Sequence, residues 1–479
     1  MDLDPDAAYA ALRARDHRFD GRLFVGVTST GIYCRPVCRV RPPRRENCRF
    51  FANAAQAEAA SFRPCLKCRP EIAPGLSAMD SSGSLAHSAA RWIGQQVQAG
   101  EPVAFDALAA RLGVTDRHLR RIFVATHGVR PSDYLTTQRL LLAKQLLTDT
   151  REPVAQVALA SGFASLRRFN AAFSERYRMA PTRLRRATDP AGAPAPEPSL
   201  RLAWRPPYDA VAIQAFLARR AVAGVEAVMP HGMRRTLALT HRGQPVAGWI
   251  EWQLDADAGQ ARLRVAPALA PALAAVIARC RHALDLDADP ARFAARMPLP
   301  ETGGLRLPGS FDPFETAVRI VLGQQVSVAA ARTLATRLVA AFGRPLATPW
   351  PALTHLFPDA PTIAAADPAA LGRLGIVRQR VEALQALAAA VAEGRLELAP
   401  QAPLERTLAT LQALPGIGAW TAQMIALRVL AWPDAFPASD IGVLRALGTR
   451  DPREALARAE AWRPWRGYAV MQLWQSLET

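Results

Sequence analysis

Six cysteines are the residues of this sequence best suited to chemistry. Four of them form two close pairs, C-x3-C and C-x2-C, with 26 residues between the pairs: Cys34, Cys38, Cys65 and Cys68. Each pair can place two sulfurs on one turn, and two such turns complete a tetrahedral zinc site in a reducing compartment. A disulfide or an activated nucleophile is the alternative use of paired cysteines. Cys48 and Cys280 lie outside the pairs, and we expect both to be buried thiols.

The first cysteine pair lies in a basic stretch, GIYCRPVCRVRPPRREN, at residues 31–47. A zinc ion with four thiolates has a net charge of about −2, and its thiolates are nucleophilic because the metal keeps them deprotonated. Such a centre would repel DNA phosphates unless cations offset it, and the stretch supplies Arg35, Arg39, Arg41, Arg44 and Arg45. A structural zinc site is the simplest interpretation of the spacing. The basic surroundings favour a second role, in which alkylation of one thiolate weakens that repulsion.

A second chemical site is predicted near the end of the sequence, in the segment LPGIGAWTAQMIALRVL. Pro-Gly-Ile-Gly between two apolar-periodic segments is typical of a helix-hairpin-helix, in which Gly416 and Gly418 let backbone amides approach a phosphate at a helix start. A plain corner between two helices is the alternative. Downstream, we expect Asp440 at the start of a helix, about one residue after a serine cap. This placement predicts a carboxylate close to the hairpin.

Composition limits the class of partner. The 479 residues predict three or four domains, and the formal net charge of +18 suits a polyanion such as nucleic acid or an anionic membrane surface. No apolar run approaches the length of a membrane span, and the first residues lack the pattern of a signal peptide. We therefore expect a cytoplasmic protein. That it is a monomer which binds double-stranded DNA and no membrane is an expectation from its motifs and family resemblances, and composition alone does not show it.

The elements that would carry these sites to DNA are predicted between them. FDALAARLGVTDRHLRRIFVATHG has a helical apolar period, with Gly113 at a turn and Thr115 as the N-cap of a second helix. VAQVALASGFASLRRFNAAFSERYRMAP repeats this pattern with Gly162 and Ser165. Both segments predict helix-turn-helix units. The outer faces of their second helices are the candidate DNA-reading surfaces, with a merely solvated face as the alternative: Arg117, His118, Arg120, Arg121, Leu166, Arg167, Arg168 and Asn170.

Two low-complexity segments predict domain boundaries. MDSSGS, residues 79–84, is rich in Ser and Gly, and TDPAGAPAPEPSL, residues 188–200, is a Pro/Ala-rich linker. Between them, residues 85–187 resemble the DNA-binding domain of the AraC/XylS family. The resemblance implies recognition helices in successive major grooves, and RNA polymerase as a partner in transcription.

Residues 22–72 resemble the N-terminal domain of the Ada family of adaptive-response regulators, through STGIYCRPVCRVRPPRRENCRFF and SFRPCLKCRPEI. The resemblance implies that Cys34 takes a methyl group irreversibly from a DNA methylphosphotriester, with the other three paired cysteines completing the zinc site. It also places the family's basic R-E-N residue at Arg45. A methylated phosphate is neutral and can approach an anionic centre. The Pro-Cys-His-Arg motif of the Ada guanine methyltransferase domain is absent, so we do not expect repair at guanine O6.

Residues 201–479 resemble 3-methyladenine DNA glycosylase II, of the helix-hairpin-helix superfamily, through LAWRPPYDAVAIQAFLARRAVAGVE, LRLPGSFDPFETAVRIVLGQQVSVAAA and the hairpin segment. Such an enzyme must extrude the damaged nucleotide and stabilise an oxocarbenium-like sugar, and Asp440 is the candidate carboxylate. The resemblance implies that Trp420 and Trp474 line the base pocket, where an electron-poor base gains about 1–2 kcal/mol from cation–π contact. A monovalent cation can assist the hairpin.

Two positions depart from the glycosylase pattern. Gln325 stands where the family usually has an apolar wedge, and Met424 stands where it has a pocket tyrosine. Lys67 and Lys144 are the only lysines in the sequence, so none lies in residues 201–479. Bifunctional relatives form a Schiff base through a hairpin lysine, whose place Trp420 takes here. We therefore expect a monofunctional glycosylase that leaves an abasic site.

The sequence as a whole predicts a multidomain fold. We expect a small zinc-bound α+β domain, an all-α AraC-type double helix-turn-helix, an α+β AlkA-type N-terminal domain and an all-α helix-hairpin-helix domain. The predicted segments, including the linker, are 1–76, 85–187, 188–200, 201–305 and 306–479. The predicted function combines methyl acceptance, transcription control and excision of alkylated purines. Two alternatives stay open: a zinc-dependent regulator whose glycosylase-like half only binds DNA, and a repair enzyme whose front half is only a tether.

Overall fold

The computed structural model describes residues 4–74, 85–188, 199–241, 243–299, 303–400 and 402–477. The predicted boundary at 79–84 lies outside these residues. Most of the predicted linker, 188–200, also lies outside them, although Thr188 ends a helix and Ser199 begins a strand. Within the described residues, no helix has both the length and the apolar character needed to cross a membrane.

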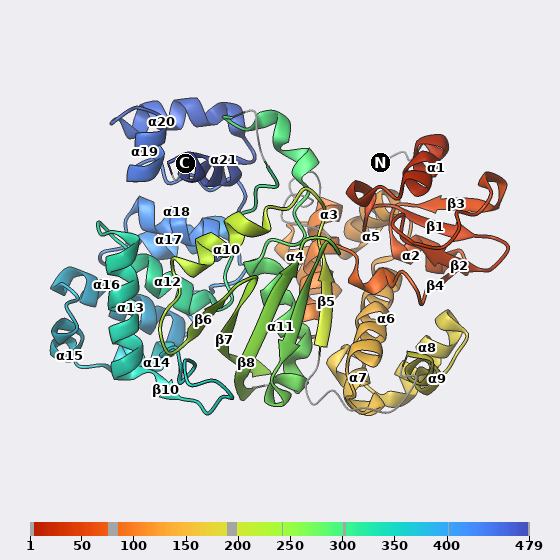
Figure 1. Ribbon diagram of the computed structural model, residues 1–479, viewed down its shortest axis with the longest axis horizontal. Helices are drawn as coiled ribbons and strands as arrows, with labels where there is room; N and C mark the ends of the chain where they lie inside the picture. Colours follow the sequence, from red (N-terminus) through yellow and green to blue (C-terminus); the bar gives the residue numbers. More distant parts are fainter. Residues whose placement is uncertain are drawn as a thin grey trace.

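The N-terminal region is a small α+β unit, drawn in red in Figure 1. Its strands lie in the order β3-β1-β2-β4, with β4 parallel to β2 and the other neighbours antiparallel. Phe24, Tyr33, Phe51 and Phe62 pack together in its core. The elements are α1 (Pro5–Ala14), η1 (His17–Phe19), β1 (Phe24–Val27), β2 (Ile32–Cys34), η2 (Arg45–Asn47), β3 (Cys48–Phe51), α2 (Ala54–Ala59), β4 (Arg63–Pro64) and η3 (Pro70–Ile72).

Two helix-turn-helix units follow, on either side of the long helix α6. The Thr115 side chain caps α5 and the Ser165 side chain caps α8, each by accepting a hydrogen bond from the backbone N–H three residues later. Gly113 and Gly162 adopt φ of +67° and +81° at the two turns, a conformation that favours glycine. The helices are α3 (Leu85–Ala99), α4 (Phe105–Arg111), α5 (Asp116–His127), α6 (Pro131–Asp149), α7 (Val154–Ala160), α8 (Leu166–Tyr177) and α9 (Pro181–Thr188).

The third region is an antiparallel sheet with strand order β5-β9-β8-β7-β6. Side chains of this sheet and of α11 belong to one buried cluster, which includes Trp252, Leu263 and Ile277. The elements are β5 (Ser199–Ala203), α10 (Ala210–Ala218), β6 (Glu226–Met229), β7 (Gly232–His241), β8 (Gln244–Asp255), β9 (Gln260–Val265), η5 (Pro267–Ala272), α11 (Leu273–Ala283), η6 (Pro290–Arg292) and η7 (Ala294–Arg296).

The last region is helical, apart from a two-stranded pair of very short strands. It has its own buried cluster, to which Phe216, Val222 and Val225 of the preceding region also belong. Its elements are α12 (Pro313–Leu322), α13 (Val328–Phe342), β10 (Arg344–Pro345), β11 (His355–Leu356), α14 (Ala360–Ala365), α15 (Pro368–Arg373), α16 (Arg378–Ala392), α17 (Leu404–Gln412), α18 (Ala419–Arg428), α19 (Ile441–Ala446), α20 (Pro452–Ala459), η8 (Glu460–Trp462) and α21 (Arg466–Gln475).

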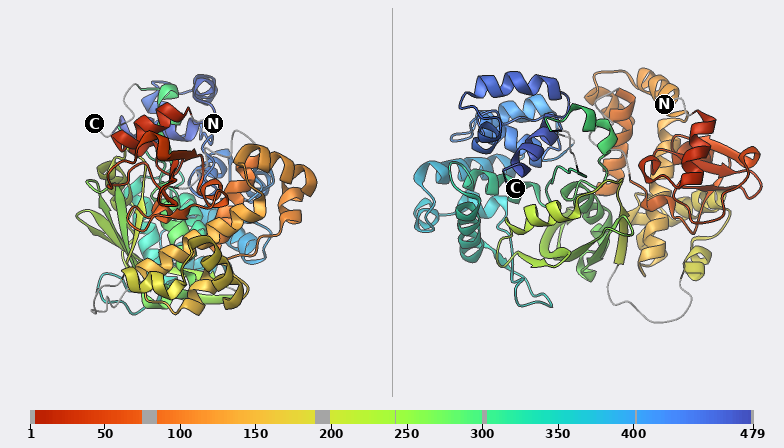
Figure 2. Two further views of the ribbon diagram at one scale, coloured as in Figure 1. Left: turned by 90° about the vertical axis from the view of Figure 1, so that its right-hand side faces the viewer. Right: turned by 45° about the horizontal axis from the view of Figure 1, so that its top comes forward.

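The two halves of the chain pack against each other. Helix α3 lies against α11, and Ile93 of α3 shares a buried cluster with Leu273 and Ile277 of α11. The red N-terminal sheet and helices α13 to α16 nevertheless lie toward opposite ends of the molecule, with the β5–β9 sheet between them (Figure 1, Figure 2). The fold is therefore the predicted series of four regions, joined by a buried contact that no local pattern predicts.

Candidate functional sites

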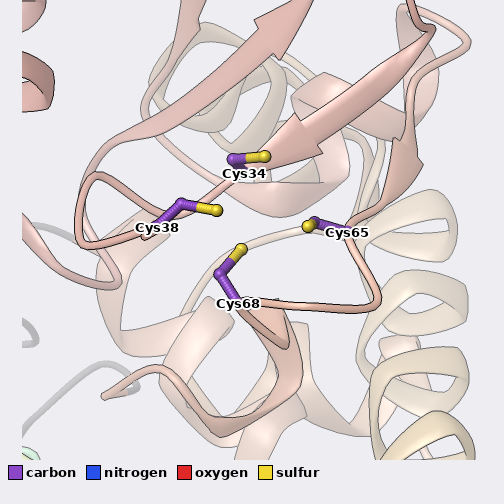
Figure 3. Close-up of side chains that lie close together, drawn as sticks. All are labelled: Cys34, Cys38, Cys65 and Cys68. Atoms are coloured by element: carbon purple, nitrogen blue, oxygen red, sulfur yellow. The ribbon is translucent and has the colours of Figure 1, made fainter. Parts of the chain in front are cut away.

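The four paired cysteines converge on one point at the edge of the N-terminal sheet. Their sulfur atoms all lie within 4.8 Å of one another and point inward (Figure 3). Cys34, Cys38 and Cys65 are buried, and Cys68 is half-buried. No disulfide joins any of the six cysteines, and Cys48 and Cys280 are buried outside the cluster, as expected.

Strand pairing brings the two cysteine pairs together. Strands β2 and β4 are parallel, with Tyr33 beside Pro64, so that the next residues, Cys34 and Cys65, leave the sheet at the same edge. The Cys65 N–H donates to the Tyr33 carbonyl at 3.0 Å. In the first pair, the Cys38 N–H donates back to Arg35 at 3.2 Å and closes the turn. A parallel pairing across 30 residues therefore builds this site from two short local turns.

The cluster fits a tetrahedral zinc ion. Sulfurs bound to zinc at about 2.3 Å lie about 3.8 Å from one another, which is compatible with the observed grouping. Hydrogen bonds between the thiols, above all from Cys34, lower the pKa of Cys38 to about 7, and the bond with Cys38 raises the pKa of Cys34. The Arg35 N–H also donates to Cys68 Sγ at 3.3 Å, a backbone contact that orients a metal ligand.

The arginines around the cluster divide into two kinds. Arg35 is buried, and its guanidinium pairs with the buried carboxylate of Asp20, so its charge is already balanced. This corrects the expectation that all five arginines offset the centre for DNA. Arg39, Arg41 and Arg44 are exposed. Arg45 is half-buried, with its guanidinium 5.1 Å from the Phe50 ring centroid and 3.3 Å from the Asp6 carboxylate.

Most of the predicted DNA-reading side chains are exposed on α5 and α8. On α5, Arg117, Arg120 and Arg121 are exposed, whereas His118 is half-buried and contacts Arg121 through Nδ1 at 3.0 Å. On α8, the exposed set is Leu166, Arg167, Arg168 and Asn170. Both helices keep their basic faces open to solvent although α3 packs against the other half. The roles of these side chains in reading DNA stay a prediction.

In the C-terminal region, Asp440 is held by the two predicted pocket tryptophans. Its Oδ2 accepts a hydrogen bond from Trp420 Nε1 at 3.0 Å, and its Oδ1 accepts one from Trp474 Nε1 at 2.9 Å. Oδ1 also accepts from the Val443 N–H at 3.0 Å, which makes Asp440 itself the N-cap of α19. The predicted serine cap is therefore wrong, because the carboxylate already satisfies the first turn of the helix.

A cavity of about 1090 Å³ lies between the last two regions, and Asp440, Trp420 and Trp474 form part of its wall. Met424 lies one turn after Trp420 on α18 and also lines the cavity, where it is 8% exposed. Gly416 and Gly418 of the hairpin contribute to the same wall. Gly416 has φ +71°, and a Cβ there would lie 2.8 Å from the Ala383 Cβ, so glycine is required for the close approach to α16.

The loop between α12 and α13 is fixed to the hairpin at the mouth of this cavity. Gln324 Nε2 donates to the Gly416 carbonyl at 2.8 Å and to Thr421 Oγ1 at 2.9 Å, and Arg380 donates to the Gln324 carbonyl at 2.5 Å. The next residue, Gln325, is exposed with φ +54°, a strained conformation for a residue with a side chain. The loop therefore presents the Gln325 side chain to solvent at the cavity mouth.

The structure adds pocket residues that sequence reasoning missed. Gly442 lies where a Cβ would be 2.9 Å from Trp474 Cδ1 and 3.1 Å from Asp440 Oδ1, so only glycine leaves room for their hydrogen bond. Arg428 lies one turn beyond Met424 on the same face of α18 and lines the cavity, together with Arg220 and Glu226 from the preceding region. Burial lowers the pKa of Arg428 to about 9. Helical spacing could have indicated Arg428, but nothing local indicates the other two.

Family models match the chain in four consecutive segments. The metal-binding domain of Ada matches residues 7–71, and a helix-turn-helix domain matches 108–187. The AlkA N-terminal domain matches 199–312, and the HhH-GPD superfamily of base excision DNA repair proteins matches 318–465. Fold and sites together define an Ada-type regulator joined to an AlkA-type DNA glycosylase.

One relative spans all four regions. The "Probable bifunctional transcriptional activator/DNA repair enzyme AlkA" of Mycobacterium tuberculosis is 40% identical over 494 residues, covering 100% of this chain and 97% of the relative. The chain belongs to this family of bifunctional Ada–AlkA proteins. The Escherichia coli DNA-3-methyladenine glycosylase 2 is 37% identical over 281 residues, which are 57% of this chain and 95% of that enzyme. A solved 3-methyladenine glycosylase from Archaeoglobus fulgidus is 21% identical over 57% of this chain and 97% of its own, with a TM-score of 0.49.

Proposed function

We propose that this chain is a bifunctional DNA alkylation-repair protein. Its N-terminal half accepts methyl groups from methylphosphotriesters and controls transcription, and its C-terminal half excises alkylated purines by hydrolysis of the N-glycosidic bond. The observation that carries the proposal is the presence, in one chain, of a four-cysteine cluster and of a carboxylate held between two tryptophans in a helix-hairpin-helix cavity.

Cys34 is the proposed methyl acceptor. Its sulfur attacks the methyl carbon, a sulfur–carbon bond forms, and the carbon–oxygen bond breaks with its electron pair going to the phosphate oxygen. The products are a thioether and an ordinary phosphodiester anion, so each chain reacts once. Zinc, when bound by the four cysteines, would keep the sulfurs deprotonated at neutral pH.

A small apolar cavity beside the cluster supports this choice of sulfur. Its volume is about 20 Å³, enough for about one water-sized group, and Cys34 and Cys38 form part of its wall. The rest of the lining is apolar: Leu12, Val25, Val27, Val40, Pro42 and Pro43. Such a wall suits a methyl group. Neither Cys65 nor Cys68 contributes to it.

Methylation is proposed to act as an electrostatic switch on promoter binding. Loss of one thiolate charge changes the centre from about −2 to about −1 and weakens its repulsion of phosphates. The exposed Arg39, Arg41 and Arg44 beside the cluster then attract the DNA backbone against a weaker repulsion. Promoter affinity should rise on methylation, and the difference should shrink at high salt. Unchanged affinity of methylated protein would refute the switch.

Asp440 is the proposed catalytic carboxylate of the glycosylase half. As the bond between C1′ and the base nitrogen breaks, the base leaves with the electron pair, and the carboxylate stabilises the cationic sugar until water adds to C1′ and loses a proton to the solvent. An alkylated purine already has a positive charge, so it leaves without a strong general acid. Trp420 and Trp474 anchor the carboxylate through their N–H groups and line the cavity beside it.

The proposed reaction stops at an abasic site. Schiff-base chemistry needs an amine in the cavity, and residues 201–479 contain no lysine. Lys144 pairs with Glu71 and is buried in α6, far along the chain from the hairpin. Borohydride should therefore trap no adduct between the protein and DNA. A trapped adduct would contradict this part of the proposal.

Further partners belong to the same proposal. Activation of transcription would require RNA polymerase, and binding to genomic DNA would place the protein at the nucleoid. A monomer suffices, because each site is complete within one chain. A monovalent cation at the hairpin is also proposed, and replacement of K⁺ by a bulky organic cation should then weaken binding of lesion DNA.

Incubation with methylated duplex DNA tests both activities in one sample. Mass spectrometry should find free alkylated purines in the supernatant and one methyl group on the peptide that contains Cys34. Cys34→Ser should abolish the second signal and keep the first, because serine is a poor nucleophile and the cavity lies elsewhere. Cys48→Ser is the matched control, since Cys48 is buried outside the cluster, and it should keep both.

Each alternative function predicts a different outcome. A regulator whose second half only binds DNA would give the methylated peptide without free bases. A repair enzyme with a simple tether would release bases and methylate Cys34, yet show no change in promoter affinity. Absence of both products would refute the whole proposal.

A further inference from the structure

Exposed apolar side chains gather at the mouth of the glycosylase cavity. Among the described residues, thirteen large hydrophobic side chains are exposed, and five of them line this one cavity. Scattered exposed hydrophobics are normal on a protein surface, but a concentration at one opening indicates an interaction surface. Four of the five have described neighbours on both sides, and we call them the apolar collar: Val326, Val328, Val377 and Ile441.

The collar stands at the opening of the cavity and not at its floor. Ile441 is 77% exposed and Val377 is 57% exposed, although both line the cavity. Met424, which lines the same cavity, is only 8% exposed. An extruded base must therefore pass the collar before it reaches Met424.

Rigid elements hold the collar in place. Val328 and Ile441 are the first residues of α13 and α19, and Val377 immediately precedes α16. Val326 lies in the loop that Gln324 fixes to the hairpin. Because helix starts and a bonded loop position them, these side chains are exposed without being free to collapse inward.

The surroundings of the collar favour a phosphate backbone. Helices α16 and α18 begin at the cavity wall, and within the described structure no side chain caps either start. Their first N–H groups can therefore donate hydrogen bonds to an anion. Arg332 and Arg380 also line the cavity. Cationic and N–H groups thus flank an apolar opening, which matches a duplex whose charged strands flank apolar base faces.

Gln325 explains why an apolar collar would be needed. It is the exposed, strained residue at the cavity mouth, and it is less suited than an apolar side chain to replace a stacked base. Extrusion of a nucleotide exposes the faces of the flanking bases and part of their sugars to water. Apolar side chains at the gap compensate for this exposure.

We propose that Val326, Val328, Val377 and Ile441 form a DNA-contacting surface that packs against the bases and sugars flanking an extruded nucleotide. The inference rests on the proposed glycosylase function. The collar residues are positioning residues: they stabilise the extruded state and leave the chemistry to Asp440. Their contribution should therefore depend on how tightly the damaged base is stacked and paired before extrusion.

Single-turnover release of 7-methylguanine by the full chain tests this. One duplex carries the lesion opposite cytosine, and a second carries it in a bulge, where extrusion costs little. Ile441→Ser and Val377→Ser should each slow release from the paired duplex by about fivefold to tenfold and from the bulge by about twofold or less. Fluorescence of 2-aminopurine beside the lesion should show less extrusion with the variants in the paired duplex.

Matched controls and a gain variant make the outcome decisive. Val211→Ser and Val228→Ser change valines that are 79% and 51% exposed but do not line the cavity, and both should match wild type. Gln325→Leu should restore much of the rate lost in Ile441→Ser. If the variants lost the same factor in rate on both substrates, or lost none, while the wild type was active, the proposed role of the collar would be overturned and the glycosylase function would stand. A wild type that releases no base from either substrate would overturn the glycosylase function itself.

Discussion

At the scale of single residues, the catalytic candidate depends on its neighbours for position. Asp440 caps α19 and also accepts the N–H groups of two tryptophans from α18 and α21. The bonds fix the carboxylate against the start of a helix. Trp420 and Trp474 would thus have two roles: they would stack on the base, and they hold the Asp440 carboxylate that would stabilise the sugar.

Asp440→Asn should lower base release by about 10²- to 10³-fold, because the amide keeps the shape and loses the negative charge that stabilises the sugar cation. Binding of lesion DNA should be retained. Chromatography measures the base release, and fluorescence anisotropy measures the binding of lesion DNA. Asp451→Asn is the matched control, since Asp451 caps α20 in the same way outside the cavity. Loss of binding equal to the loss of activity would argue against a catalytic role.

Gly442→Ala should lower base release by about tenfold with little change in thermal stability. The new Cβ would lie 2.9 Å from Trp474 Cδ1 and push the indole away from the carboxylate. Gly372→Ala in α15 is the control, because a Cβ there meets no atom within 4 Å. A Gly442→Ala protein with wild-type activity would mean that the bond between Trp474 and Asp440 is not required.

At the scale of elements, helix α2 joins the zinc-binding region to α6 through a buried acid. Glu58 accepts hydrogen bonds from Tyr33 at 3.0 Å and from Thr137 of α6 at 2.8 Å. Burial raises the pKa of Glu58 to about 7. The contact between the two elements therefore contains a carboxyl group whose pKa lies near neutral pH.

The stability of the folded protein should fall as the pH rises through the range in which Glu58 loses its proton. Between about pH 4.5 and pH 7, the native state holds a proton on Glu58 that the unfolded chain has lost, so the free energy of unfolding decreases with pH. Glu58→Gln should remove this dependence. Relative to wild type, the variant should gain on the order of 3 kcal/mol between about pH 4.5 and about pH 8. Urea unfolding at several pH values measures the gain, and parallel curves for the two proteins would refute the assignment.

At the scale of the whole molecule, one buried arginine links the two halves. Arg205 is 2% exposed and donates to the carbonyls of Asp20 and Pro74 in the N-terminal region, at 2.9 and 3.3 Å. It also donates to the Asp287 carbonyl at 2.7 Å. Asp20 in turn pairs with Arg35 beside the cysteine cluster. Arg205 thus connects the region of the β5–β9 sheet, through Asp20 and Arg35, to the candidate zinc centre.

Arg205→Met should separate the unfolding of the two halves. Methionine fills much of the space but leaves the buried carbonyls of Asp20 and Pro74 and the half-buried carbonyl of Asp287 without this donor, at a cost of about 3 kcal/mol. Calorimetry should show the N-terminal region unfolding at a lower temperature than the rest. Arg373→Met, at an exposed arginine of α15, should leave the trace unchanged. Coincident transitions for Arg205→Met would show that the hydrophobic contact between α3 and α11 is sufficient.

Local patterns in the sequence determined much of this protein. Cysteine spacing predicted the cluster, turn glycines with Thr115 and Ser165 predicted the two helix-turn-helix units, and Pro-Gly-Ile-Gly predicted the hairpin. Such features depend on the backbone preferences of a few neighbouring residues, so they can be recognised without knowledge of distant contacts.

Contacts between distant segments were decided only by the tertiary structure. Asp440 lies 20 residues from one tryptophan partner and 34 from the other, and the hydrogen bonds between them follow from how α18, α19 and α21 pack. The pairing of Arg35 with Asp20, the clamp of Arg205 and the apolar collar likewise depend on which surfaces meet. Many pairings of such groups are compatible with one sequence pattern, and only the packing of the whole chain selects among them.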